Sequence, residues 1–207
     1  MYLRMITKKG KWESYKNGNP NDLSSDVITN CLKTANETLS MWNITDISQI
    51  DEAIVALASK RQSISYIDYI IIPSDFITKY SLELNKISGQ TPYINFNPYH
   101  FDIINLNYVM LGTVSTMILD IISNSEGHII RVPIKQVALK LLNAINERKL
   151  DMKLMDRNLL CELLKEIDRG TKIQKDYDPD IVTEMRKLCE EDYKEIFCTK
   201  CGNKLIG

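Results

Sequence analysis

One ten-residue run, Ile64-Ser65-Tyr66-Ile67-Asp68-Tyr69-Ile70-Ile71-Ile72-Pro73, constrains the fold more than any other stretch of the sequence. It is rich in β-branched and aromatic residues and is closed by a proline, which is the pattern of a buried strand. Only Ser65 and Asp68 interrupt its apolar side chains, so both faces of the strand are mostly apolar. A strand of this kind needs cover on both faces. The sequence therefore predicts a central strand enclosed by helices.

The segment before this run predicts a strand, a helix and a return to the central strand. Residues 38–44 alternate in the manner of a strand. Apolar residues then recur at helical spacing, at Ile47, Ile50, Ile54 and Leu57. The length of this connection suits a right-handed βαβ unit. A hairpin is predicted further upstream, with strands at 2–6 and 12–15 and with Gly10 at a turn position of positive φ.

Beyond the central strand the pattern becomes mainly helical. The sequence predicts a helix over 74–87, an extended loop over 90–98 and a long apolar helix over 103–123. A short strand over 128–132 precedes three helices that begin at Pro133, Met152 and Pro179. The predicted fold class is α/β, a mixed sheet with a βαβ core covered by helices, with a mainly helical C-terminal half. The predicted organisation is one α/β domain over residues 1–175, followed by a C-terminal helix and a Cys-x-x-Cys tail over 176–207.

Charge, length and cysteine usage limit the classes of function. The net charge is −1, which gives no overall electrostatic case for binding nucleic acid or an anionic membrane. No stretch approaches 18 uninterrupted apolar residues, so no membrane span is predicted. The five cysteines have no disulfide-framework spacing, which indicates reduced thiols and a cytoplasmic protein. The expected class is a bacterial or phage-type protein. We expect a partner protein or a homo-oligomer rather than a membrane.

The most specific local motif is the C-terminal Cys198-Thr199-Lys200-Cys201-Gly202. It resembles one knuckle of a zinc ribbon, and the resemblance covers about the last ten residues. Zinc in a structural site takes four ligands, and this resemblance implies only Cys198 and Cys201. Cys189 is the nearest further thiol, but a helix running to Ile196 would place it about 12 Å from the helix end. Cys161, a histidine, or the same knuckle from a second subunit are the other ways to complete the site, and a metal-free knuckle or a redox pair remain alternatives.

Acid–base chemistry has few candidates, because the chain contains two histidines. His100 and Asp102 share a face of an extended segment, so that the carboxylate could orient the imidazole as a general base requires. Asp68 interrupts the central strand and must find a partner or emerge at an edge. Asp75 follows that strand, where open α/β sheets bind ligands. The alternative for each is structural: a loop hydrogen bond, a bond within the fold, or a helix cap.

A third possibility is a nucleic-acid surface at the N-terminus. Lys8, Lys9 and Lys11 flank Trp12, which could stack on a base. In the alternative, Trp12 packs inward and the lysines keep the surface soluble.

These observations favour an interaction or accessory protein over a stand-alone enzyme. We expect it to act through protein–protein contacts, with the C-terminal helix and the knuckle as the docking element and zinc as the candidate cofactor. A small enzyme that uses Asp68, Asp75, His100 and Asp102 is the first alternative. A nucleic-acid-binding module that uses the N-terminal lysines and the knuckle is the second.

Overall fold

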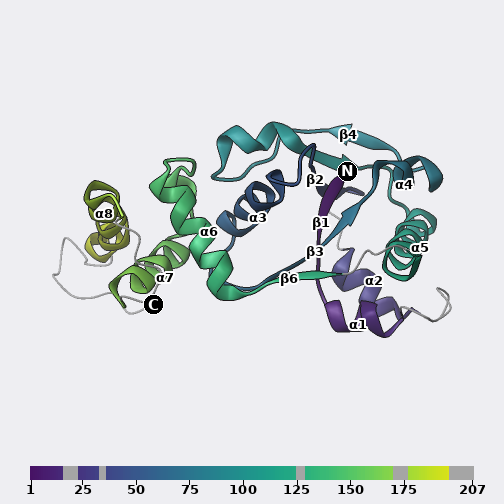
Figure 1. Cartoon of the computed structure of the whole chain (residues 1–207), viewed down its shortest axis with the longest axis horizontal. Helices are drawn as coiled ribbons and strands as arrows, with labels where there is room; N and C mark the ends of the chain where they lie inside the picture. The colour runs from purple at the N-terminus through teal and green to yellow at the C-terminus, as the bar shows by residue number, and fades with distance from the viewer. Residues whose placement is uncertain (16–22, 33–35, 125–128, 170–176, 196–207) are drawn as a thin grey trace. The chain divides into compact units, whose positions relative to one another are not determined.

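The computed structural model describes residues 1–15, 23–32, 36–124, 129–169 and 177–195 (Figure 1). The chain divides into two compact units. The first comprises Met1–Ile54, Tyr66–Gln90 and Asn95–Pro133, and the second comprises Val55–Ser65, Thr91–Ile94 and Ile134–Gly207. The units interleave in the sequence, so no single position along the chain separates them.

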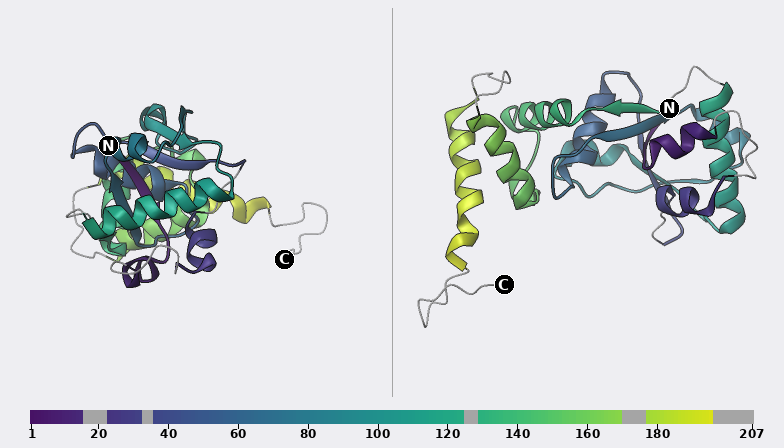
Figure 2. Two further views of the ribbon diagram at one scale, coloured as in Figure 1. Left: turned by 90° about the vertical axis from the view of Figure 1, so that its right-hand side faces the viewer. Right: turned by 90° about the horizontal axis from the view of Figure 1, so that it is seen from below.

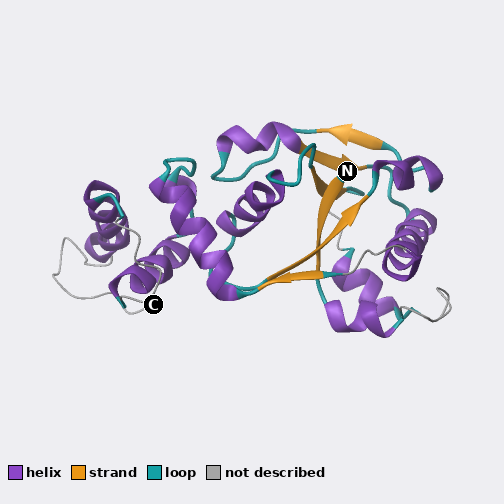
Figure 3. Cartoon of the chain, in the orientation of Figure 1, coloured by secondary structure: helices purple, strands orange, loops and turns teal. Residues whose placement is uncertain are grey.

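The first unit is built on one sheet. Among the described residues, six strands form this sheet in the order β4-β5-β2-β1-β3-β6, and every neighbouring pair is antiparallel (Figure 3). The strands are β1 (Tyr2–Ile6), β2 (Leu39–Asn43), β3 (Ile67–Ile72), β4 (Leu84–Lys86), β5 (His100–Ile103) and β6 (Ile130–Val132). The helices are α1 (Lys9–Ser14), α2 (Ser25–Cys31), α3 (Gln49–Ser59), α4 (Ser74–Lys79), α5 (Tyr108–Asn124), α6 (Ile134–Asn146), α7 (Arg157–Asp168) and α8 (Pro179–Glu195), with 3-10 turns η2 (Ile94–Tyr99) and η3 (Met152–Leu154). The predicted α/β class and the mainly helical second half are confirmed.

The predicted order of strand, helix and strand corresponds to β2, α3 and β3. Both strands pair antiparallel with β1, so they run parallel to each other with β1 between them. This is a split βαβ arrangement, in which an inserted strand makes every neighbouring pair antiparallel. The apolar pattern of β3 predicts that this strand is buried on both faces. It does not predict which strands are its neighbours in the sheet.

Strand β3 is buried on both faces, as its composition predicts. The register places Ile70 on the same face as Ile6 and Met41, and this face packs against residues of α1, α2 and α5. Leu3 and Ile67 lie on the other face, where Figure 1 shows the first turns of α3. Two covered faces account for the unbroken apolar run.

The predicted N-terminal hairpin is wrong, because residues 9–14 form α1. Lys8, not Gly10, takes the left-handed conformation, with φ 59°, and it opens the helix. Trp12 is completely buried in the core of the first unit. The alternation that predicted a strand covers only the four residues 12–15, which are too few to distinguish a strand from a helical turn.

The segment after β3 also differs from the prediction. Helix α4 ends at Lys79, and shortly after it Ser81 takes a left-handed φ of 51°. The last residues of the predicted helix instead form the strand β4. Part of the predicted extended loop is the 3-10 turn η2. Strand β5 occupies residues 100–103, before the apolar helix begins at Tyr108. Strands of three or four residues are too short to show a period.

The second unit follows the predicted helices closely. Asp156 caps α7 by accepting the N–H of Asn158 at 2.8 Å, so the helix predicted to begin at Met152 is divided into η3 and α7. The apolar stripe of α8 lies inside this unit, with Ile181 and Met185 buried. None of the helices in the described parts of the chain is both long and apolar enough to cross a membrane.

Candidate functional site

Asp68, the carboxylate within the apolar strand β3, is paired with Arg131. Its two oxygens accept hydrogen bonds from Nε and a terminal nitrogen of Arg131 at 2.7 and 2.8 Å. The two residues are directly opposite in the β3–β6 register, and the guanidinium also lies 4.1 Å from the centre of the Tyr66 ring. The hydrogen bonds to Asp68 raise the pKa of Arg131. This bidentate pair fastens the edge strand β6 to the sheet, which is a structural role.

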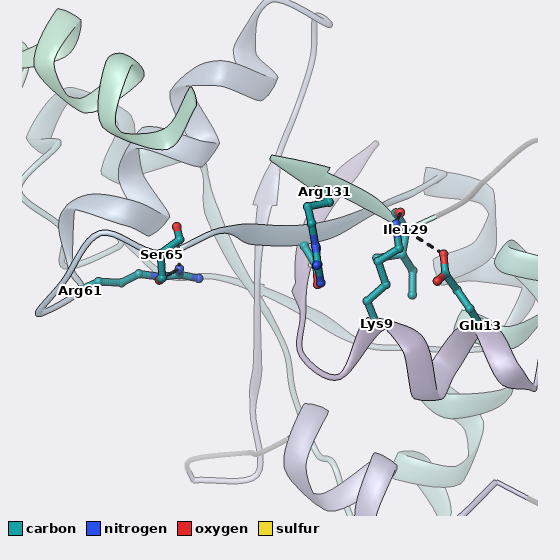
Figure 4. A network of polar contacts seen from close by, with 7 residues as sticks. Lys9, Glu13, Arg61, Ser65, Ile129 and Arg131 are labelled. Carbon is teal, nitrogen blue, oxygen red and sulfur yellow. Dashed lines mark hydrogen bonds and ion pairs between the residues drawn. The ribbon is translucent and has the colours of Figure 1, made fainter. Parts of the chain in front are cut away.

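A lysine of α1 also contacts the β6 edge of the sheet. Lys9 Nζ donates to the carbonyl of Ile129 at 2.6 Å and lies 3.5 Å from Glu13 (Figure 4). This contact occupies a backbone carbonyl beside the edge strand, and lysines at sheet edges oppose unwanted strand pairing. With Trp12 completely buried, the predicted stacking surface for a nucleic-acid base is absent from this segment. The alternative in which Trp12 packs inward is confirmed.

We predict that loss of Arg131 destabilises the protein more than neutralisation of Asp68. Arg131→Met leaves the buried carboxylate without its cation, whereas Asp68→Asn keeps an oxygen that accepts a guanidinium hydrogen bond and leaves no buried charge. Because half of the Arg131 side chain is exposed, water screens the charge and limits the loss. Urea unfolding midpoints of the two variants measure the difference, and equal midpoints would contradict this role for the pair.

His100 and Asp102 lie on β5, in extended backbone on one face of the strand as predicted, but the hydrogen bonds of His100 are not those of a general base. His100 Nδ1 is 2.9 Å from the carbonyl of Ile87, so this nitrogen carries the proton. Nε2 is 3.7 Å from Asp102 Oδ1. In a general-base arrangement the carboxylate would accept the imidazole N–H and the lone pair would face a substrate. Here a backbone carbonyl takes the N–H, and the imidazole packs edge-on against Trp42.

The four predicted acid–base residues do not form one site, although His100 and Asp102 are neighbours on β5. The register places Asp68 and Asp102 on opposite faces of the sheet and three strands apart, which is about 14 Å at the usual strand spacing. Asp75 is exposed in the first turn of α4, while Asp68 is at the start of β3, about 13 Å away along the strand. Antiparallel neighbours also give the sheet no common carboxyl edge at which a ligand site could form.

Two cysteines of the second unit are in contact. Cys161 on α7 and Cys189 on α8 are both partly buried, and their thiols are hydrogen-bonded. Arg157 reinforces the contact, because its Nε donates to the carbonyl of Cys189 at 3.1 Å. Burial and the hydrogen bond to Cys161 together raise the pKa of the Cys189 thiol to about 12, against the opposing charge of Arg157. A thiol of this kind is a poor nucleophile at neutral pH.

The predicted metal ligands Cys198 and Cys201 lie outside the described residues. Within the residues that the structure describes, no three or more histidine, cysteine or acidic side chains are grouped to hold a metal ion. Sequence reasoning named Cys161 and Cys189 only as separate ways to complete a site. Their contact depends on the packing of α7 against α8, and 28 positions of sequence separation give no signal of it.

Comparisons with protein-family models, with curated proteins and with solved structures found no significant match to this chain.

Proposed function

We propose that the chain is a non-catalytic interaction protein that acts through protein–protein contacts, and that the first turn of α5 is one of its contact surfaces. The observation that supports this proposal is the exposure of two large side chains at the start of a helix whose later turns pack into the core. Tyr108 is 92% exposed and Val109 is 76% exposed. Burial begins further along α5, with Val114, Met117 and Ile118 completely enclosed.

The local sequence explains why these side chains project. Asn107 caps the helix by accepting the N–H of Met110 at 3.0 Å, which makes Tyr108 and Val109 its first two residues. They precede the segment that lies on the sheet, and nothing in the turn is charged. Tyrosine beside an apolar residue is typical of the anchor residues of protein interfaces.

Charge supports a protein as the partner. No lysine or arginine occurs between Lys86 and Arg131, a stretch that includes all of α5. Membrane-surface helices and nucleic-acid sites both depend on basic residues. The predicted docking element, α8, has its apolar stripe inside the second unit, and its exposed residues as far as Glu190 are mostly polar or charged. The start of α5 is therefore the better-supported surface.

The occupant that we propose for this surface is a second copy of the chain. An uncharged patch can face its own copy across a two-fold axis without repulsion between like charges. A net charge of −1 likewise gives little long-range repulsion between two copies.

Sedimentation of the full chain tests this proposal with a double variant and a matched control. Tyr108→Ser together with Val109→Ser is expected to shift a dimer to a monomer. Ile47→Ser removes a side chain of the first unit that is 75% exposed and lies outside α5, and this variant is expected to remain a dimer. A wild-type chain that is monomeric at every concentration, or a double variant that still dimerises, would overturn the assignment of this surface.

A further inference from the structure

The imidazole of His100 is held in place by three neighbours. Its Nδ1 donates to the carbonyl of Ile87 at 2.9 Å. Its ring packs edge-on against Trp42, with the ring centres 5.1 Å apart. Gly89 passes so close that a Cβ atom added there would lie 3.3 Å from the Cβ of His100. Histidines that bind a metal usually donate their other ring N–H to a backbone carbonyl in this way, which fixes the orientation of the ring.

The carboxylate of Asp102 lacks part of the pairing that a buried charge requires. Asp102 is 8% exposed, and its Oδ1 is buried with no hydrogen-bond partner among the described residues. Arg4 interacts with this carboxylate through charge, but its terminal nitrogens donate to the carbonyls of Ser40 and Cys31, at 2.8 and 3.2 Å. A buried carboxylate oxygen without a partner is costly unless a cation or a donor binds to it.

The unpaired oxygen lies near the second ring nitrogen of His100. Asp102 Oδ1 and His100 Nε2 are 3.7 Å apart, which is too long for a hydrogen bond. In the neutral imidazole Nε2 carries the lone pair, because Nδ1 bears the proton that the carbonyl of Ile87 accepts. Two acceptor atoms at this distance repel each other unless a cation lies between them.

The distance between these two atoms also fits two ligands of one metal ion. Zinc binds histidine nitrogen at about 2.0–2.1 Å and carboxylate oxygen at about 2.0–2.2 Å, so the two ligand atoms are about 3.4 Å apart at a tetrahedral angle. Small side-chain rotations close the difference. His100 and Asp102 are two positions apart on β5 and share one face, so the strand itself sets their spacing.

A third ligand is available on the neighbouring strand. Asn85 on β4 is directly opposite Asp102 in the register, and it is exposed. Directly opposite residues have Cβ atoms about 4.5–5.5 Å apart on the same face of a sheet, which lets their side chains reach one ion. Ser40 is opposite Asp102 on the other side, on β2, and is also exposed, so solvent reaches this part of the face.

We infer that His100 Nε2, Asp102 Oδ1 and the amide oxygen of Asn85 bind one divalent transition-metal ion, with water in the fourth position. Imidazole nitrogen together with carboxylate and amide oxygen suits zinc and its neighbours in the first transition series. The ion pairs the unsatisfied carboxylate oxygen and joins the edge strand β4 to β5, which is a stabilising role. All three ligands belong to the first unit, and the site requires neither the cysteines nor the contact surface on α5.

The first test is calorimetric titration with Zn²⁺ of a full chain that carries Cys198→Ser and Cys201→Ser, so that the thiols of the C-terminal motif take up no zinc. This parent chain is expected to bind Zn²⁺, and its thermal midpoint is expected to rise with Zn²⁺ concentration. His100→Gln and Asp102→Asn are each expected to weaken binding at least about tenfold, the loss that even an outer-shell partner of a metal ligand causes. Asn85→Ala is expected to weaken it by a smaller factor.

Asp75→Asn is the matched control for Asp102→Asn. It removes the same charge from an exposed position on α4 of the first unit, and it is expected to leave the zinc affinity of the parent chain unchanged.

Nuclear magnetic resonance of the imidazole places the ion at this site. The chain has two histidines, so His128→Gln in the parent chain leaves the imidazole signals of His100 alone. Zn²⁺ is expected to shift these signals, and to leave them unshifted in the Asp102→Asn variant if that variant still shows native circular dichroism.

Two results would overturn the inference. Signals of His100 that respond to pH but not to Zn²⁺ would mean that a proton alone lies between the imidazole and Asp102. Zinc affinity that is unchanged by any one of the three ligand substitutions would mean that the ion has other ligands.

Discussion

Trp12→Ala is expected to lower the free energy of unfolding by about 3–5 kcal/mol, the usual range for truncation of a fully buried tryptophan. Trp12 is completely buried in the core of the first unit, where α1 and α2 cover the sheet. Truncation would leave a cavity that the neighbouring strands, fixed by their ladder, cannot fill. Urea denaturation, followed by circular dichroism, measures the loss.

Trp12→Phe is the control for this prediction. Phenylalanine keeps most of the aromatic volume and removes an indole N–H that has no hydrogen-bond partner among the described residues. We therefore expect it to cost much less than alanine. If the protein tolerated Trp12→Ala without loss of stability, Trp12 would not be a core residue, and its role as a stacking platform for nucleic acid would have to be reconsidered.

Gly89→Ala is the second substitution with a large expected effect. A Cβ atom at this position would lie 2.8 Å from a ring carbon of Trp42 and 2.9 Å from Asn97 Oδ1. Both neighbours are buried, and Trp42 is stacked on Phe96, so neither can move aside easily. Overpacking of this kind costs about 1–3 kcal/mol. The urea midpoint of the variant measures the cost.

Gly112→Ala is the matched control for the same substitution. Nothing lies within 4 Å of the position that its Cβ would take, and the residue is exposed on α5. Alanine has the higher helix propensity, by about 1 kcal/mol, so this variant is expected to be neutral or more stable. Equal midpoints for the two alanine variants would contradict the close packing around Gly89.

How far the sequence predicts this fold depends on the length of each pattern. The run that becomes β3 is long and apolar on both faces, and it is a buried strand as predicted. The helices α6, α7 and α8 have several turns of regular spacing and strong start signals, such as the cap at Asp156. Short helices and strands cannot be predicted in this way. A segment as brief as β4 or α1 carries too few residues for a period, and tertiary packing determines its structure.

The sequence also fails to predict the side-chain contacts at the candidate sites, but for a different reason. Sequence reasoning requires a partner for Asp68, and the structure supplies Arg131, which is 63 positions away. That pairing depends on which strands are neighbours, and no local pattern determines this. The contact of Cys161 with Cys189 likewise depends on helix packing. The sequence does not show the exposure of Tyr108 either, because Tyr108 begins an apolar helix whose later apolar residues are mostly buried.

Native mass spectrometry of the full chain tests most directly the central claim, that this protein works by contact rather than by catalysis. One spectrum gives the number of copies and the number of bound metal ions. We predict a dimer for the wild-type chain and a monomer for the variant in which Tyr108 and Val109 are both replaced by serine. A wild-type chain that is monomeric at every concentration would contradict the contact surface.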